Sequence, residues 1–283
     1  MTGPARRALA LTLVIGGALA PAGNAQATAT FAAPLATPVA GISPLATPPT
    51  VTDLNGDGHL DVVTIENGGT MQLSTVRGDG MGLFVPFAFA SGLSGSGSFG
   101  FSVGRVNADA LPDVVTSADA GVRLGLNAAG AFPASTAVAP AAIQPVLADL
   151  NGDGKADLVL PSGTTVDVRL NDGAGTFLPA SSTLSRSPAV PTPFAYVGDV
   201  TGDGSPDIVT WSRGQIVPSD PDGKLAVFPN DGTGHFPATP APGSVIQFTN
   251  NAAPEFLTCR PVIVDINGDG AKDFGAPTAE GGS

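Results

Sequence analysis

Short apolar runs alternate along the chain with polar stretches that are rich in Asp, Asn and Gly. The runs at residues 62–65, 145–148 and 208–211 each lie beside such a stretch. Elsewhere apolar and polar residues alternate, and in residues 166–170 this places the two valines and the leucine on one face. Short runs and period-two alternation, bounded by turn residues, predict β-strands joined by tight turns. We therefore expect an all-β fold.

One nonapeptide recurs between these runs. It occurs five times, starting at residues 53, 105, 149, 199 and 265, and reads DLNGDGHLD, RVNADALPD, DLNGDGKAD, DVTGDGSPD and DINGDGAKD. A second repeat, an Asp/Gly turn that ends on Phe, follows at Phe84, Phe132, Phe177 and Phe236. A repeat of about fifty residues with three or four short strands has the size of one propeller blade. The chain is thus predicted to be a β-propeller of about five blades.

The last blade is predicted to be incomplete or to be closed by the N-terminal segment. The loop-to-Phe distance of about 28 residues would put a fifth Phe near residue 293, but the sequence ends at Ser283. Residues 29–31 (ATF) resemble the end of such a turn, so residues 28–48 could supply the closing strand. The alternative is that residues 28–48 form a flexible leader rich in Ala, Pro and Thr. The repeat region itself is assigned to residues 49–283.

Residues 1–27 have the parts of a secretory signal peptide. Arg6 and Arg7 precede the apolar run 8–20, and residues 25–27 (AQA) form a small-x-small cleavage site. An apolar run of 13 residues is shorter than the roughly 20 that span a bilayer. We therefore expect a secreted, extracellular protein that is cleaved near Ala27 and has no membrane span in its mature chain. Cys259 is the only cysteine, so no disulfide can stabilise the fold within the chain.

The nonapeptide has the oxygen-rich spacing of a calcium loop. In D-x-[N/T]-G-D-G-x-x-D, oxygen side chains occupy positions 1, 3, 5 and 9, and position 7 would add a backbone carbonyl. Four intact copies predict about four calcium sites, with candidate ligands Asp53, Asn55, Asp57, His59, Asp61; Asp149, Asn151, Asp153, Lys155, Asp157; Asp199, Thr201, Asp203, Ser205, Asp207; and Asp265, Asn267, Asp269, Ala271, Asp273. The alternative is a set of metal-free turns, held by their own side-chain hydrogen bonds.

The acidic charge agrees with a cation-binding role and disfavours nucleic acid as a partner. The chain has 24 acidic against 12 basic residues and a net charge of -12. Four bound divalent ions would bring that charge to about -4. The second copy differs, since Arg105 replaces the aspartate of position 1. We expect the Arg105 guanidinium to act there as an internal counter-ion for Asp109 or Asp113, with an Arg105 exposed to solvent as the alternative.

The loop, the apolar strand after it and the Gly-x-Gly-x-Phe turn resemble the FG-GAP or VCBS repeats over about residues 49–277. Members of that family include the propeller heads of integrin alpha chains and many secreted bacterial proteins. The resemblance implies a calcium-stabilised β-propeller, usually seven-bladed, that works in adhesion or ligand binding. Five recognisable repeats depart from that blade number.

No catalytic constellation is visible, so we expect a non-catalytic interaction or adhesion module rather than an enzyme. The partner would be an extracellular protein or a glycan. A lectin-type propeller is the alternative, although the exposed aromatic in every blade that would mark it is not seen in the sequence. Residues 77–79 spell the integrin-recognition tripeptide Arg-Gly-Asp, but Asp79 aligns with the ordinary turn aspartate Asp172.

Overall fold

The computed structural model describes residues 49–67, 71–95, 100–118, 121–140, 142, 144–185, 194–212, 223–248, 262–270 and 272–275. The predicted signal peptide 1–27, the whole segment 28–48 and Cys259 lie outside these residues. Within them every regular element is a β-strand, which confirms the all-β prediction. The described part of the chain contains no helix of the length and apolarity that a membrane crossing requires.

The strands form four antiparallel sheets of four strands and one sheet of two strands, in chain order. Three of the four-stranded sheets consist of β1 (Thr50–Thr52), β2 (Asp61–Asn67), β3 (Met71–Gly78) and β4 (Phe84–Gly95); β5 (Gly100–Gly104), β6 (Asp113–Ala118), β7 (Gly121–Gly125) and β8 (Thr136–Ala139); and β9 (Val146–Ala148), β10 (Asp157–Ser162), β11 (Thr165–Arg169) and β12 (Ser182–Ser185). The others consist of β13 (Phe194–Gly198), β14 (Asp207–Ser212), β15 (Gly223–Phe228) and β16 (Val245–Phe248); and β17 (Val262–Val264) and β18 (Asp273–Gly275).

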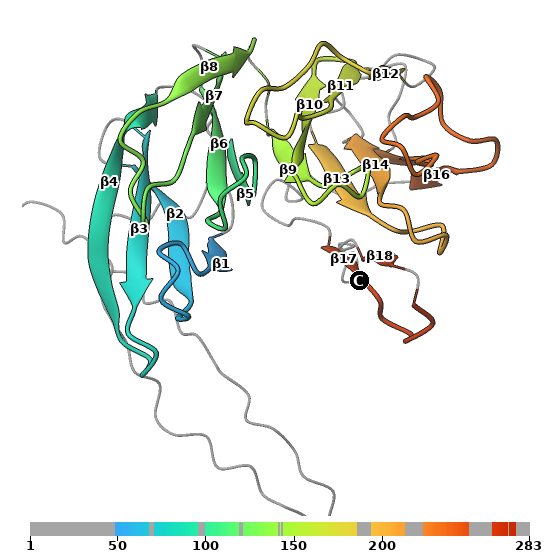
Figure 1. Ribbon diagram of the computed structural model, residues 1–283. Coiled ribbons are helices and arrows are strands. Elements are labelled where there is room, and N and C mark those ends of the chain that lie inside the picture. Colours follow the sequence, from blue (N-terminus) through green and yellow to red (C-terminus); the bar gives the residue numbers. More distant parts are fainter. Residues whose placement is uncertain are drawn as a thin grey trace, which may run out of the picture.

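Each four-stranded sheet is an up-and-down meander in which every strand pairs with its neighbour in sequence. This is the strand order of a propeller blade. The nonapeptide connects the first strand of each sheet to the second, as the hairpin prediction required. We number the sheets as blades one to five. In Figure 1 the blades follow one another in chain order, and no strand pairing joins the described part of the fifth blade to the first.

Burial follows the predicted alternation. In β11 the side chains of Val166 and Val168 are buried, while those of Thr165, Asp167 and Arg169 are partly exposed. The second strand of each of the first four blades is buried along consecutive residues instead, as in β10, where residues from Asp157 to Pro161 are buried. In the second and third blades both faces are covered, because the side chains of β6 and β10 enter the clusters on either side of their blades. The apolar runs of the sequence are therefore the central strands of the fold.

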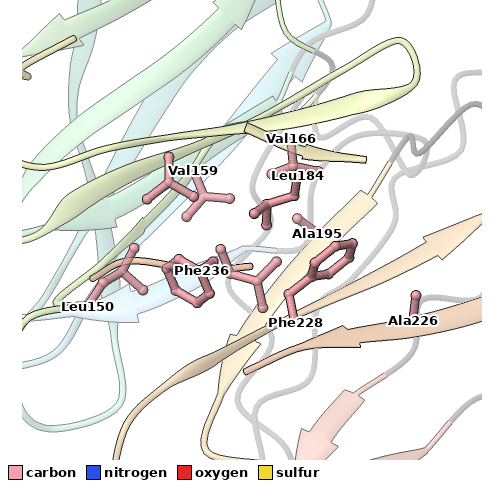
Figure 2. Packing of buried hydrophobic residues seen from close by; sticks show 10 residues of the cluster. Leu150, Val159, Val166, Leu184, Ala195, Ala226, Phe228 and Phe236 are labelled. Carbon is pink, nitrogen blue, oxygen red and sulfur yellow. The ribbon is translucent and has the colours of Figure 1, made fainter. Parts of the chain in front are cut away.

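The hydrophobic core is divided into three clusters, each between consecutive blades. Figure 2 shows the cluster between blades three and four, where Val159 and Leu184 of one blade face Phe228 and Phe236 of the next. The turn residue Phe236 is buried against the preceding blade, and Phe132 has the same place between blades one and two. The closing Phe of the second, third and fourth blades is thus a residue of inter-blade packing, with Phe177 partly buried against the remaining cluster.

Candidate functional site

The nonapeptide loops are built around the aspartate of position 1. Asp53 accepts the backbone N–H of Gly56 on Oδ1 at 2.8 Å and that of Gly58 on Oδ2 at 2.9 Å. The same two bonds form in the other three intact loops, from Asp149, Asp199 and Asp265. The glycines at positions 4 and 6 adopt positive φ in each of these loops, a conformation that costs glycine little. The glycines therefore let the backbone fold around one carboxylate.

Positions 3 and 5 form a second, outer layer of bonds. Asn55 Oδ1 accepts the N–H of Asp57 at 2.9 Å, and Asp57 Oδ1 accepts the N–H of His59 at 2.9 Å. The position 5 aspartate is exposed in every loop. Oxygen side chains at positions 1, 3 and 5 thus share one loop and remain accessible, which suits a hard divalent cation in its donor chemistry.

The aspartate of position 9 lies in a different environment. Asp61, Asp113, Asp157 and Asp207 are buried, with exposed fractions of 2%, 0%, 0% and 0%. Asp157 Oδ2 accepts the N–H of Leu150 at 2.9 Å, and its Oδ1 accepts the N–H of Asn171 at 2.8 Å. Equivalent pairs of bonds hold the other three. This carboxylate ties the loop to the end of the third strand.

Two of these buried carboxylates, those of Asp113 and Asp157, are costly to ionise. Burial raises the pKa of Asp113 and Asp157, against the lowering effect of the backbone N–H groups that they accept.

In the fifth loop, Asp273 Oδ2 accepts the N–H of Ile266 at 2.8 Å. Across the described residues, no three His, Cys, Asp or Glu side chains gather in an arrangement that could hold a metal ion. The loops are hydrogen-bonded turns in their own right, with position 9 engaged by backbone amides. Ala271, the proposed position 7 of the fifth loop, lies outside the described residues.

An asparagine at the end of the third strand joins consecutive blades. Asn171 Nδ2 donates to the carbonyl of Val106 in the preceding blade at 2.6 Å and to that of Ala156 in its own blade at 3.0 Å. Asn127 and Asn230 make the corresponding bonds, to Leu54 and Leu150 of their preceding blades. We call Asn127, Asn171 and Asn230 the clasp asparagines. Sequence reasoning alone did not predict this role, although an Asn precedes the Asp/Gly turn in two copies of the second repeat and begins the copy that has no Asp.

The second loop lacks the ion pair that was predicted for Arg105. The Arg105 side chain is exposed and, among the residues that the structure describes, forms no ion pair with Asp109 or Asp113. That prediction is wrong, and the alternative, an Arg105 exposed to solvent, is found. Asp113 is buried and accepts backbone N–H groups, and Asp109 is hydrogen-bonded within its own loop. The second loop has no acceptor side chain at position 1 and no glycine at positions 4 and 6. These differences go together, because in the first loop the N–H groups of the two glycines donate to Asp53. The bonds among positions 3, 5 and 7 are kept.

In the first loop, by contrast, an arginine side chain forms an ion pair with a loop aspartate. Arg77 Nη2 lies 2.9 Å from Asp57 Oδ2. The Arg77 guanidinium, together with the N–H of His59 and the amide of Asn55, lowers the pKa of Asp57 from 3.8 to about 2. Asp79 accepts the N–H groups of Met81 and Leu83, and the same turn bonds form at Asp172 and Asp231. The Arg-Gly-Asp tripeptide is therefore part of the loop and turn structure.

The model of the FG-GAP-like repeat matches residues 53–116, 105–160 and 149–210, which together span residues 53–210 of the 283. The chain belongs to the FG-GAP-like repeat family. Each matched segment runs from one nonapeptide into or beyond the next. Each matched segment therefore contains the loop and the central strands of a blade, and the second and third segments also contain a clasp asparagine. A comparison with curated proteins gave no match.

Several solved structures resemble this FG-GAP-like chain. A lectin from Agrocybe aegerita, whose structure concerns recognition of non-reducing terminal N-acetylglucosamine, is 26% identical with a TM-score of 0.49, over 71% of this chain and 51% of the lectin. The Photorhabdus luminescens Tc holotoxin pore is 22% identical with a TM-score of 0.46, over 85% of this chain and 11% of that one. The V. cholerae biofilm matrix protein Bap1 is 18% identical with a TM-score of 0.39, over 66% and 27%. The chain thus spans about half the length of the lectin and smaller parts of the other two.

Proposed function

We propose that this FG-GAP-like chain is a secreted, calcium-stabilised interaction module without catalytic activity. Calcium is supported by the carboxylates of the third and fourth loops. Asp149 and Asp153 lie in one loop, as do Asp199 and Asp203, and within the described residues none of these four carboxylates is in an ion pair. Two like charges in one exposed loop repel each other unless a cation lies nearby.

Calcium would be held by the oxygens of positions 1, 3 and 5 and by the carbonyl of position 7. Its role would be structural, since it would neutralise the loops that connect the first two strands of the blades. Extracellular calcium sites have dissociation constants of roughly 0.1 to 1 mM, so at 1 mM calcium each site adds about 0.4 to 1.4 kcal/mol of stability. Several sites together would add a few kcal/mol.

Thermal unfolding tests this proposal. The chain without residues 1–27 is freed of metal with a chelator, and its melting temperature is recorded with excess chelator, with 1 mM calcium and with 1 mM magnesium. We expect calcium to raise the melting temperature by several degrees and magnesium to raise it less, because magnesium gives up its water ligands reluctantly. Equal melting temperatures in calcium and chelator would refute a stabilising calcium. Secretion is tested separately, by expressing the full chain and sequencing the N-terminus of the exported product, which we expect to begin near Thr28.

The interaction role rests on the arrangement of the blades. Rigid sheets carry several exposed loops and turns, and such loops are common binding elements. A glycan is the second candidate ligand, because a shallow depression of about 390 Å³ lies at the turn of the fourth blade and is lined by Asn230, Asp231, His235 and Phe236 between Pro229 and Pro237. Glycan-array screening of the calcium-loaded chain, with His235→Ala as the comparison variant, tests this candidate.

A further inference from the structure

The first loop is the place where the repeat carries its own cation. Arg77 lies at the end of β3, directly before Gly78, whose N–H donates to Asp61 at 2.9 Å. The N–H groups of Asn127, Asn171 and Asn230 make the same bond in their blades. The structural equivalents of Arg77 are therefore the residues before these asparagines, Leu126, Leu170 and Pro229. Of these four positions, only the one in the first blade bears a charge.

Arg77 engages the atom that a metal would need. Asp57 Oδ1 accepts the N–H of His59, and Asp57 Oδ2 is paired with the guanidinium and with the side-chain amide of Asn55. In the third loop, Asp153 Oδ1 accepts the N–H of Lys155, while its carboxylate is in no ion pair among the described residues. Lys155 itself belongs to that loop, at position 7, yet it too forms no ion pair within the described part of the chain.

From this difference we infer that Arg77 is an internal counter-ion that weakens calcium binding in the first loop, and that the loops beginning at Asp149, Asp199 and Asp265 are the stronger calcium sites. The inference rests on the proposed function and lowers the expected number of stronger sites from four to three. A divalent ion in the first loop must either displace the guanidinium from Asp57 or bind beside a positive charge. Two unit charges about 4 Å apart in water interact by about 1 kcal/mol. We therefore expect the affinity of the first loop for calcium to be weaker on the order of tenfold.

Isothermal titration calorimetry with calcium on the metal-free chain measures the number of sites directly. We expect three sites of similar affinity and a fourth that is about tenfold weaker. Asp57→Asn should leave the three sites unchanged, whereas Asp153→Asn should remove one of them. Loss of one of the stronger sites in Asp57→Asn would overturn the inference.

Variants at the charged position separate charge from shape. Arg77→Gln should bring the fourth site to the affinity of the other three, while Arg77→Lys, which keeps the charge, should leave it weak. Pro229→Arg, which places a guanidinium at the equivalent position of the fourth blade, should weaken one of the three sites. Circular dichroism of each variant confirms that it is folded. Four equal sites in the wild-type chain would overturn the inference and leave the calcium proposal standing, whereas no calcium binding in any variant would overturn both.

Discussion

The side-chain amide of Asn127 donates to the backbone carbonyl of Leu54, 73 residues earlier in the chain, at 2.8 Å. Leu54 is itself buried in the cluster between the first two blades. The same bond recurs from Asn171 to Val106 and from Asn230 to Leu150. One asparagine in each of three blades thus holds the loop of the preceding blade. The first blade has Gly78 at this position, so it has no side chain with which to make this bond.

The clasp asparagines are expected to contribute strongly to stability. Asn171→Ala removes the donor to two buried carbonyls and an acceptor for the N–H of Gly173. Buried polar groups that lose their partners cost about 1 to 3 kcal/mol, so the free energy of unfolding should fall by about 2 to 4 kcal/mol. Urea unfolding measures this change. Thr164→Ala, in an exposed turn of the same blade, is the control and should change it by less than about 0.5 kcal/mol. Equal effects of the two variants would contradict the clasp.

Positions 5 and 9 of the nonapeptide are expected to respond differently to calcium. Asp157→Ala leaves the N–H groups of Leu150 and Asn171 without their buried acceptor, so it should cost about 2 to 4 kcal/mol with or without calcium. Asp153→Ala changes an exposed side chain and should cost stability mainly when calcium is present. Unfolding curves of both variants in chelator and in 1 mM calcium make the comparison. A loss in Asp157→Ala that appears only with calcium would show that position 9 acts as a ligand.

The acid titration of Asp57 is expected to depend on Arg77. The pKa of Asp57 is lowered to about 2, mainly by its hydrogen bond with Arg77. The ionised Asp57 therefore stabilises the fold fully at pH values above 3.8, the pKa of this group in the unfolded chain. That contribution is lost as the pH falls from 3.8 through about 2. In the metal-free chain, Arg77→Gln should move the pKa of Asp57 upward toward 3.8, and Arg77→Lys should move it less. Carboxyl chemical shifts followed by NMR report this pKa, and an unchanged value in Arg77→Gln would contradict the ion pair in solution.

The contact between the first two blades is expected to tolerate no added side chain at Gly125. A Cβ atom there would lie 2.7 Å from Leu93 Cδ1 and 3.3 Å from Phe132 Cδ1. Gly125→Ala should therefore destabilise the chain by about 1 to 3 kcal/mol through overpacking. Combining it with Leu93→Ala should cost less than the sum of the two single changes, because the shortened side chain makes room for the new methyl group. Additive losses in denaturant unfolding would show that the two residues do not share this contact.

The sequence by itself determined the strands, the loops and their repeat. Apolar runs on either side of each nonapeptide predicted the hairpins, and these hairpins are the first two strands of the blades. Asp53 and the glycines that fold around it are within six residues of one another, so the pattern of the loop could be recognised without a tertiary structure. The oxygen spacing also predicted calcium, which stays a prediction.

Only the tertiary structure decided what these groups contact. Position 9 was predicted as a ligand from its spacing, but Asp157 is buried, and one of its partners, Asn171, belongs to the end of another strand. The carbonyl that accepts from Asn171 is 65 residues away in the sequence. An arginine does pair with a loop aspartate, but the pair is Arg77 with Asp57, 20 residues apart, and not the predicted pair of Arg105. Local patterns specify turns because turns are made by neighbouring residues. Packing between blades brings together residues that no spacing in the sequence relates.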